Sequence, residues 1–459
     1  LLRPASFQAD FVKHLGQYAH GTRLWAFKAF DAWLVEVPGS DGRRRRVLWI
    51  NGTGGMGKSV IAGKICKLPA ETVVVASFFC KHSVDDRNDP RHCVRTLAWQ
   101  LARRFPKVRE ELERMAREAE GSAFHEAVSG STGATVEEVF GTLIGGPLRK
   151  VFGEAGELVP EGERGPFVIV VDALDELRAG GTRNQFLRLV AKQLPSLPEN
   201  FLVLVTSRPE KDITEALKNL DPVLIDKGDK QNLADLKHFA KSQVVRHVEG
   251  DAAEKDALLK AMLEGAEGVF LALRLMGDAV QSEGDGTAAR AVEIIKSKKN
   301  FLTDTYRETL GRVDKMLADS SHGDADVLEG LREKLRKTLQ VLVAAKRELT
   351  LGEISVLTSE STGTGLGQGT EVLMGALSLL FTSTSRGAPF RPLHKTVHDF
   401  LEGDEGGVGM DDYGWLEDDD EEVREAVVET LVNIDSGALT EHAAASDAAI
   451  DAFLVRGSR

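Results

Sequence analysis

The chain has 459 residues, of which 42% are hydrophobic and 28% charged, and its formal net charge is −13. This is the composition of an ordinary globular protein with about three domains. The acidic balance argues against a general nucleic-acid-binding surface, and no apolar stretch approaches the roughly 18 residues of a membrane span. Three cysteines do not make a disulfide framework and no secretory signal is visible, so we expect a cytoplasmic protein.

The first half of the chain predicts a parallel sheet flanked by helices. Residues 1–45 are expected to be mainly helical and to lead into the first strand. Short, continuous apolar runs then alternate with helical segments, as is typical of strands buried on both faces. These runs are VLWI (47–50), VVVASFF (73–79), FVIVV (167–171), FLVLVT (201–206) and VLI (223–225). Strands separated by helices indicate the α/β class.

Two further regions follow the predicted sheet. From residue 230 to about 347 the apolar positions recur with the helical period, so we expect helices throughout. Residues 349–401 predict a short helix, a β-pair (380–393) and a helix beginning near His394. This order is compatible with a winged helix, and a generic α+β unit has the same pattern. The predicted domains are a helical lead-in (1–45), a P-loop nucleotide-binding domain (46–228), a helical domain (229–348), a winged helix (349–403) and an acidic linker with the start of a helical region (404–459).

The sequence GTGGMGKS at residues 52–59 matches the phosphate-binding loop pattern G-x-x-x-x-G-K-[ST]. Glycines let the backbone wrap closely, so that successive N–H groups point at one anion, and the following helix adds its positive dipole end. Lys58 supplies a charge for the β- and γ-phosphates, and Ser59 offers a hydroxyl to Mg²⁺. The residues expected to bind nucleotide are Gly52, Thr53, Gly54, Gly55, Met56, Gly57, Lys58, Ser59 and Val60.

FVIVVDALDEL (167–177) is an apolar strand that ends in acidic residues. A carboxylate at the end of a buried strand is costly unless it meets a cation or hydrogen-bond donors. We therefore expect Asp172 to complete a Mg²⁺ site opposite Ser59. One of the two following acids, Asp175 or Glu176, is expected to orient or deprotonate the attacking water. A strand-end cap followed by surface acids is the alternative.

The strand FLVLVT (201–206) is followed by Ser207 and Arg208. Ligands of open α/β folds bind outside the carboxyl ends of the strands, so Arg208 could sense a γ-phosphate there. A structural ion pair between Arg208 and Asp175 or Glu176 is the competing interpretation.

Together these residues resemble the NACHT branch of the STAND class of P-loop NTPases, and more narrowly the nephrocystin-type and fungal NACHT modules of NOD-like proteins. The segment before the loop also resembles that family, and Arg23 and Trp25 within it could line the base site. The segments that carry the resemblance are GTRLWAFKAFDAWL (21–34), VLWINGTGGMGKS (47–59), VIVVDALDEL (168–177) and VTSRPE (205–210), with weaker matches in EGVFLALRL (267–275) and RPLHKTVHDFL (391–401).

The resemblance implies an ATP/ADP-dependent molecular switch with slow, Mg²⁺-dependent ATP hydrolysis. Such a switch is closed with ADP, opens with ATP, forms homo-oligomers in the ATP state and acts on protein signalling partners that the sequence does not identify. By position, the resemblance makes Arg208 the sensor-1 residue. It places His394 where the family has a winged-helix histidine that touches the ADP β-phosphate, with Lys395 in place of an acid. A helix N-cap or core histidine is the alternative for His394.

Two other classes of function remain open. One is an ordinary P-loop enzyme, a GTPase or small-molecule kinase. DKGD (226–229) approaches the GTPase base-binding motif but has the wrong first residue, and the D-x-x-G switch is absent after Asp172. A kinase would need a substrate lid, whereas this chain continues into helical and winged-helix parts. The other class is a non-hydrolysing, nucleotide-stabilised scaffold, against which the Asp175–Glu176 pair argues.

Overall fold

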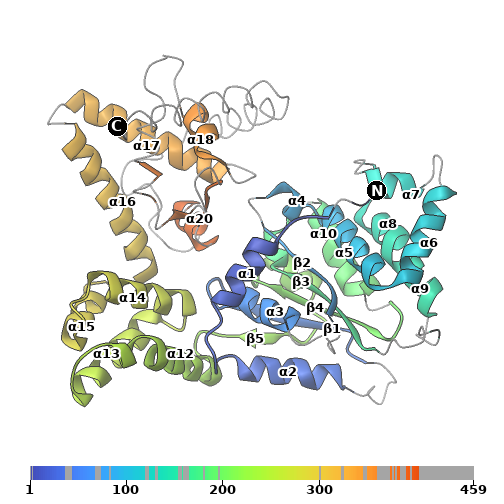
Figure 1. Cartoon of the computed structure of the whole chain (residues 1–459), viewed down its shortest axis with the longest axis horizontal. Helices are drawn as coiled ribbons and strands as arrows, with labels where there is room; N and C mark the ends of the chain where they lie inside the picture. The colour runs from blue at the N-terminus through green and yellow to red at the C-terminus, as the bar shows by residue number, and fades with distance from the viewer. Residues whose placement is uncertain are drawn as a thin grey trace, which may run out of the picture. The chain divides into compact units, whose positions relative to one another are not determined.

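The computed structural model describes most of the chain, which divides into two compact units, Leu1–Lys296 and Ser297–Arg459 (Figure 1). No helix among the described residues is long and apolar enough to cross a membrane. The described residues are 2, 4–36, 44–67, 74–81, 84–118, 123–129, 133–153, 158, 165–178, 181–194, 197–298, 301–321, 325–344, 349–358, 373–374, 377, 380–382, 389–392 and 395–402.

The first unit is built on a five-stranded sheet with the strand order β2-β3-β4-β1-β5, in which all pairs are parallel. The strands are β1 (Val47–Gly52), β2 (Val74–Phe79), β3 (Phe167–Asp172), β4 (Phe201–Ser207) and β5 (Val223–Ile225). Each corresponds to one of the apolar runs in the sequence, so the predicted α/β fold is confirmed. All residues of the central strands β1, β3 and β4 are buried, because helices cover both faces.

Helices surround this sheet, as the sequence predicts. The described helices of the first unit are α1 (Gln8–Gly16), α2 (Leu24–Leu34), α3 (Lys58–Cys66), α4 (Asp85–Asn88), α5 (Pro90–Arg104), α6 (Pro106–Arg117), α7 (Ala123–Ser129), α8 (Val136–Phe140), α9 (Gly146–Phe152), α10 (Gly181–Arg188), α11 (Lys211–Ala216), α12 (Lys230–Gln243), α13 (Ala252–Ala266), α14 (Phe270–Glu283) and α15 (Ala288–Lys296). Helix α5 starts where Asp89 accepts a hydrogen bond from the Arg91 N–H, followed by Pro90 at the first helical position. Residues Thr135 and Glu138 form a capping box at α8.

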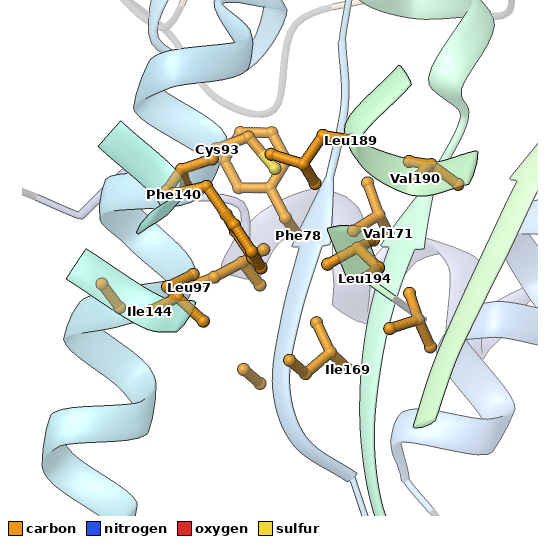
Figure 2. Packing of buried hydrophobic residues seen from close by; sticks show 14 of the residues in the cluster. Phe78, Cys93, Leu97, Phe140, Ile144, Ile169, Val171, Leu189, Val190 and Leu194 are labelled. Carbon is orange, nitrogen blue, oxygen red and sulfur yellow. The ribbon is translucent and has the colours of Figure 1, made fainter. Parts of the chain in front are cut away.

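One face of the sheet carries the main hydrophobic core. Phe78 of β2 and Val171 of β3 face Leu97 of α5, together with Ile144 and Leu189 from two short π-helical turns, η1 (Gly141–Gly145) and η3 (Leu189–Gln193) (Figure 2). Helix α3 packs on the strands as well. Alternate residues of a strand point to opposite faces of the sheet. The residue that follows Val171 in β3 and the residue that follows Val205 in β4 therefore point away from this core, toward the other face.

An aromatic cluster closes the sheet at the amino ends of two strands. Phe167 begins β3 and Phe201 begins β4, and their rings pack with those of Phe105 and Phe152 at centroid separations of 5.0 to 6.0 Å. The insertion between β2 and β3 is therefore anchored at the amino end. The opposite edge of the sheet, at the carboxyl ends of the strands, carries the phosphate loop and the acidic turn after β3.

The second unit contains α16 (Phe301–Ser320), α17 (Ala325–Ala344), α18 (Leu351–Leu357), β6 (Phe381–Thr382), β7 (Arg391–Pro392) and α20 (Lys395–Glu402). Strands β6 and β7 form an antiparallel pair. Tyr306 of α16 hydrogen-bonds to Thr396 of α20 at 2.9 Å, and its ring lies 5.5 Å from that of Phe400. The order helix, β-pair, helix is the one predicted over 349–401. Residues 393–394, which include His394, and residues 403–459 lie outside the described part.

Candidate nucleotide-binding site

The phosphate loop runs from the end of β1 into α3. Gly55 and Gly57 have φ angles of +73° and +84°, in the left-handed region that glycine adopts without a side-chain clash. Gly57 is the residue directly before α3, so the loop delivers the chain to a helix N-terminus. The first N–H groups of an α-helix have no intrahelical acceptor, and such an end is a ready anion site. Thr53 and Gly54 lie in the same loop, and Val60 lies in the first turn of α3.

Lys58 folds back over the loop that it follows. Its Nζ donates hydrogen bonds to the carbonyl oxygens of Gly52 at 2.6 Å and Thr53 at 2.9 Å. Burial lowers the pKa of Lys58 to about 8, and the nearby Asp175 carboxylate opposes this shift. A phosphate entering the loop would offer this ammonium a charged acceptor, which makes a stronger hydrogen bond than a carbonyl does.

Ser59, at the start of α3, lies near Asp172, at the end of β3. The Asp172 carboxylate, at 2% exposure, accepts a hydrogen bond from Thr206 Oγ1 at 2.6 Å, and the Ser59 hydroxyl is close enough to influence its pKa. Burial raises the pKa of Asp172, and both hydroxyls lower it. A hydroxyl and a carboxylate are the hard oxygen ligands that Mg²⁺ takes, usually one or two of them together with substrate phosphates. The pair therefore fits the magnesium site predicted from the sequence.

Asp175 and Arg208 are paired at the same edge. The backbone N–H of Arg208 donates to Asp175 Oδ1 at 3.0 Å, and Arg208 Nε lies 3.3 Å from Asp175 Oδ2. The Asp175 side chain is buried, whereas Glu176, the next residue in a 3₁₀ turn η2 (Leu174–Glu176), is only half-buried. The ion pair between Arg208 and Asp175, the competing interpretation of the sequence, is therefore present, and Asp175 lies near Asp172.

Arg183 is a site residue that the sequence patterns do not indicate. It is buried on α10, and its Nη2 donates to Glu210 at 2.5 Å and to Asp212 at 3.0 Å. Its Nη1 reaches the carbonyl oxygen of Asp175 at 3.5 Å. Arg183 therefore ties the acidic turn after β3 to the segment after β4. In the sequence it looks like one more polar residue of a surface helix.

A second buried arginine joins the loop to the helical region. Arg23 Nη2 donates to the Met56 carbonyl at 2.7 Å, and its Nη1 donates to Asn232 Oδ1 at 2.8 Å. The guanidinium carbon lies 4.5 Å from the centroid of the Phe270 ring. Burial lowers the pKa of Arg23 to about 10, and the neighbouring Asp235 opposes the shift. Arg23 thus contacts the phosphate loop, α12 and α14 at once.

The turn between α13 and α14 also rests on the loop. Asn232 Nδ2 donates to the Gly268 carbonyl at 2.9 Å, and the Leu271 N–H donates to the Gly55 carbonyl at 3.2 Å. Trp25 Nε1 donates to Asp235 at 3.0 Å. The start of the helical region is therefore part of the wall of this site.

The family model described as "Nephrocystin 3, N-terminal" matches residues 21–208. The matched stretch begins just before Arg23 and ends at Arg208, so it includes the phosphate loop and the acidic turn after β3. No curated protein matches the chain.

Proposed function

We propose that the chain is an ATP/ADP-dependent molecular switch of the NACHT type, with slow Mg²⁺-dependent ATP hydrolysis. One observation carries the proposal. The phosphate loop and the acidic end of β3 are separated in the sequence by more than a hundred residues, yet Ser59 and Lys58 both lie close enough to Asp172 to lower its pKa. This is the arrangement that a nucleotide phosphate with its metal ion requires.

Each residue of the proposed site has its own role. Lys58 and the loop N–H groups bind the phosphates, and Ser59 with Asp172 holds Mg²⁺, which neutralises phosphate charge when bound. Arg208 keeps Asp175 engaged through two contacts. Glu176 is half-buried, so it is more accessible to water than the buried Asp175. We therefore assign the orientation of the attacking water to Glu176, and we assign to Asp175 the positioning of Arg208 as the γ-phosphate sensor.

The switch itself is proposed from the contacts of the phosphate loop and from the family resemblance. Arg23 and Leu271 donate hydrogen bonds to carbonyl oxygens of the phosphate loop. A change in the loop conformation on phosphate binding would therefore alter the contacts of the loop with α12 and α14. We propose a winged-helix domain after the helical region, with His394 on the ADP β-phosphate, and homo-oligomerisation in the ATP state that reaches protein signalling partners.

The proposal is tested by identifying the bound nucleotide. The chain is purified and any nucleotide that accompanies it is identified by mass spectrometry, followed by calorimetric titration with ATP, ADP and GTP. Bound ADP, and ATP affinity that Lys58→Ala abolishes, support the switch, because neutral neighbours cannot replace a charge-assisted contact. Bound GDP would support a GTPase instead. Unchanged ATP affinity in Lys58→Ala would refute the assignment of this loop.

A further inference from the structure

Thr206 occupies an unusual position between the two halves of the proposed site. It lies in β4, the strand between β1 and β3, and its side chain is fully buried. We infer that Thr206 is a positioning residue for the metal ligand Asp172, and that it sets the Mg²⁺ affinity of the site without being a ligand itself. The inference deepens the proposed function and rests on it.

The hydroxyl of Thr206 makes two hydrogen bonds with fixed roles. It accepts the backbone N–H of Ala173 at 2.8 Å and lies 2.6 Å from Asp172 Oδ1. A hydroxyl has one proton and two lone pairs. Because the Ala173 N–H occupies a lone pair, the proton is directed to the carboxylate. The hydroxyl therefore holds one oxygen of Asp172 in a defined direction, and the metal ion meets a carboxylate that is already oriented.

The same hydroxyl holds the turn that follows Asp172. Ala173 has a φ of +58°, a left-handed conformation that is strained for a non-glycine residue. Strained residues persist where the surroundings fix them, and here the fixing bond is that of Thr206 to the Ala173 N–H. The chain leaves the sheet at this turn, and Asp175 and Glu176 follow directly after it. Thr206 thus connects the orientation of the metal ligand to the placement of the acids.

The Thr206→Val and Thr206→Ser variants test the inference. Valine keeps the shape and removes the hydroxyl, whereas serine keeps the hydroxyl. Mn²⁺, which takes the same oxygen ligands as Mg²⁺, is titrated into each protein with bound ADP and followed by electron paramagnetic resonance. Loss of a partner that orients a metal ligand lowers metal affinity by about 10- to 100-fold. We expect this loss in Thr206→Val and near wild-type affinity in Thr206→Ser. ADP affinity measured without metal should stay within about twofold in both, since Thr206 acts through Asp172.

Ala173→Gly separates the two effects of the hydroxyl. Glycine removes the strain of the left-handed turn, so it should restore Mn²⁺ affinity to Thr206→Val only if Thr206 acts by holding the turn. We expect no restoration in the double variant, and full restoration would overturn the inference. If Thr206→Val does not fold, Thr206→Cys replaces it, because a thiol is a weaker donor. Its Mn²⁺ affinity should fall as well.

The two proposals fail in different ways. A wild-type protein that binds neither ADP nor Mn²⁺ refutes the proposed function and this inference together. A wild-type protein that binds both, with Thr206→Val or its cysteine replacement binding Mn²⁺ equally well, refutes only the role of Thr206.

Discussion

Asp175 and Glu176 are neighbours in the sequence but lie in different surroundings. Asp175 is buried and receives a backbone N–H and a guanidinium contact from Arg208, while Glu176 is half-buried. Asp175 therefore maintains a contact within the protein, and Glu176 is the more accessible of the two acids to a water molecule. The two acids are therefore suited to different tasks, and substitution should separate these tasks.

Asp175→Asn should lower stability, and Glu176→Gln should lower turnover. Removing the charge of Asp175 weakens a buried, charge-assisted contact, so we expect a loss of about 2 kcal/mol in the free energy of unfolding. Removing the basicity of Glu176 should slow hydrolysis by about 10²-fold with stability nearly unchanged. Urea unfolding and phosphate release measure the two effects. If Glu176→Gln hydrolyses ATP at the wild-type rate and a stable Asp175→Asn hydrolyses it slowly, then Asp175, and not Glu176, orients the water.

The sequence predicts some of these residues and not others, for a physical reason. Lys58 and Ser59 belong to one contiguous loop whose backbone geometry fixes their spacing, and Asp172 is marked by being a carboxylate at the end of an apolar strand. Arg183 and Arg23 acquire their roles from partners elsewhere in the chain. Arg23 meets Asn232 across 209 positions, and no local pattern records that meeting.

At the scale of elements, the phosphate loop and the α13–α14 turn are shaped for each other. A Cβ on Gly55 would lie 2.9 Å from Val269 Cγ1 and 3.0 Å from Leu271 Cβ. A Cβ on Gly268, in the turn, would lie 2.3 Å from the Lys227 carbonyl oxygen. Apolar periodicity predicts the strands and helices themselves, but it contains no information on this contact between a loop and a turn.

Gly55→Ala and Gly57→Ala form a matched pair of variants. Both glycines have positive φ angles, so both substitutions carry a backbone strain of about 1 kcal/mol. Only the Gly55 Cβ would meet Val269 and Leu271, since nothing lies within 4 Å of a Cβ on Gly57. We expect Gly55→Ala to destabilise the nucleotide-free protein by a further 1–3 kcal/mol or so, measured by urea unfolding. An equal decrease in the free energy of unfolding for Gly55→Ala and Gly57→Ala would show that the α13–α14 turn moves aside at no cost.

Helix α1 is held on the sheet by a group of buried and half-buried ionisable side chains, one of which is a histidine with an altered pKa. Asp10 forms ion pairs with Arg87 and Lys81, and His14 stacks on Phe79 with ring centroids 6.1 Å apart. Burial lowers the pKa of His14 from 6.5 to about 4, and Asp10 opposes this shift. The folded protein therefore prefers a neutral His14.

Acid should loosen this attachment of α1. A folded-state pKa below the unfolded value means that the unfolded chain binds more protons, so the contribution is present above pH 6.5 and is lost as the pH falls toward 4. The loss amounts to at most about 3 kcal/mol. We expect the free energy of unfolding to fall more steeply in wild type than in His14→Gln over this range. His20→Gln, at an exposed position, should follow wild type. Parallel curves for wild type and His14→Gln would contradict the assignment.

At the scale of the whole molecule, the first compact unit reaches beyond the sheet. It extends to Lys296, so it includes α12 to α15 as well as the sheet and its phosphate loop. The contacts of Arg23 with Asn232 and of Leu271 with Gly55 explain why these helices belong to it. Composition and periodicity place a domain boundary where strands give way to helices, whereas compactness is decided by such long-range contacts.

The second unit is expected to control the release of ADP. If His394 touches the β-phosphate, it favours the ADP-bound closed state, because a ligand biases two conformations only through contacts that differ between them. A coupling of about 1–3 kcal/mol corresponds to roughly a 5- to 150-fold change in the equilibrium. We therefore expect His394→Ala, and a chain of residues 1–296, to release ADP faster and His394→Ala to self-associate more readily with ATP.

His398→Ala, in α20 and four residues later in the sequence, is the matched control and should release ADP at the wild-type rate. Off-rates are measured with a fluorescent ADP analogue and particle sizes by light scattering. Apart from His394, all the residues assigned to the phosphates and the metal lie within Leu1–Lys296, so the shortened chain should still bind ADP. Equal off-rates for wild type and His394→Ala would leave His394 as a structural residue. A shortened chain that alone released ADP faster would then place the coupling elsewhere in residues 297–459.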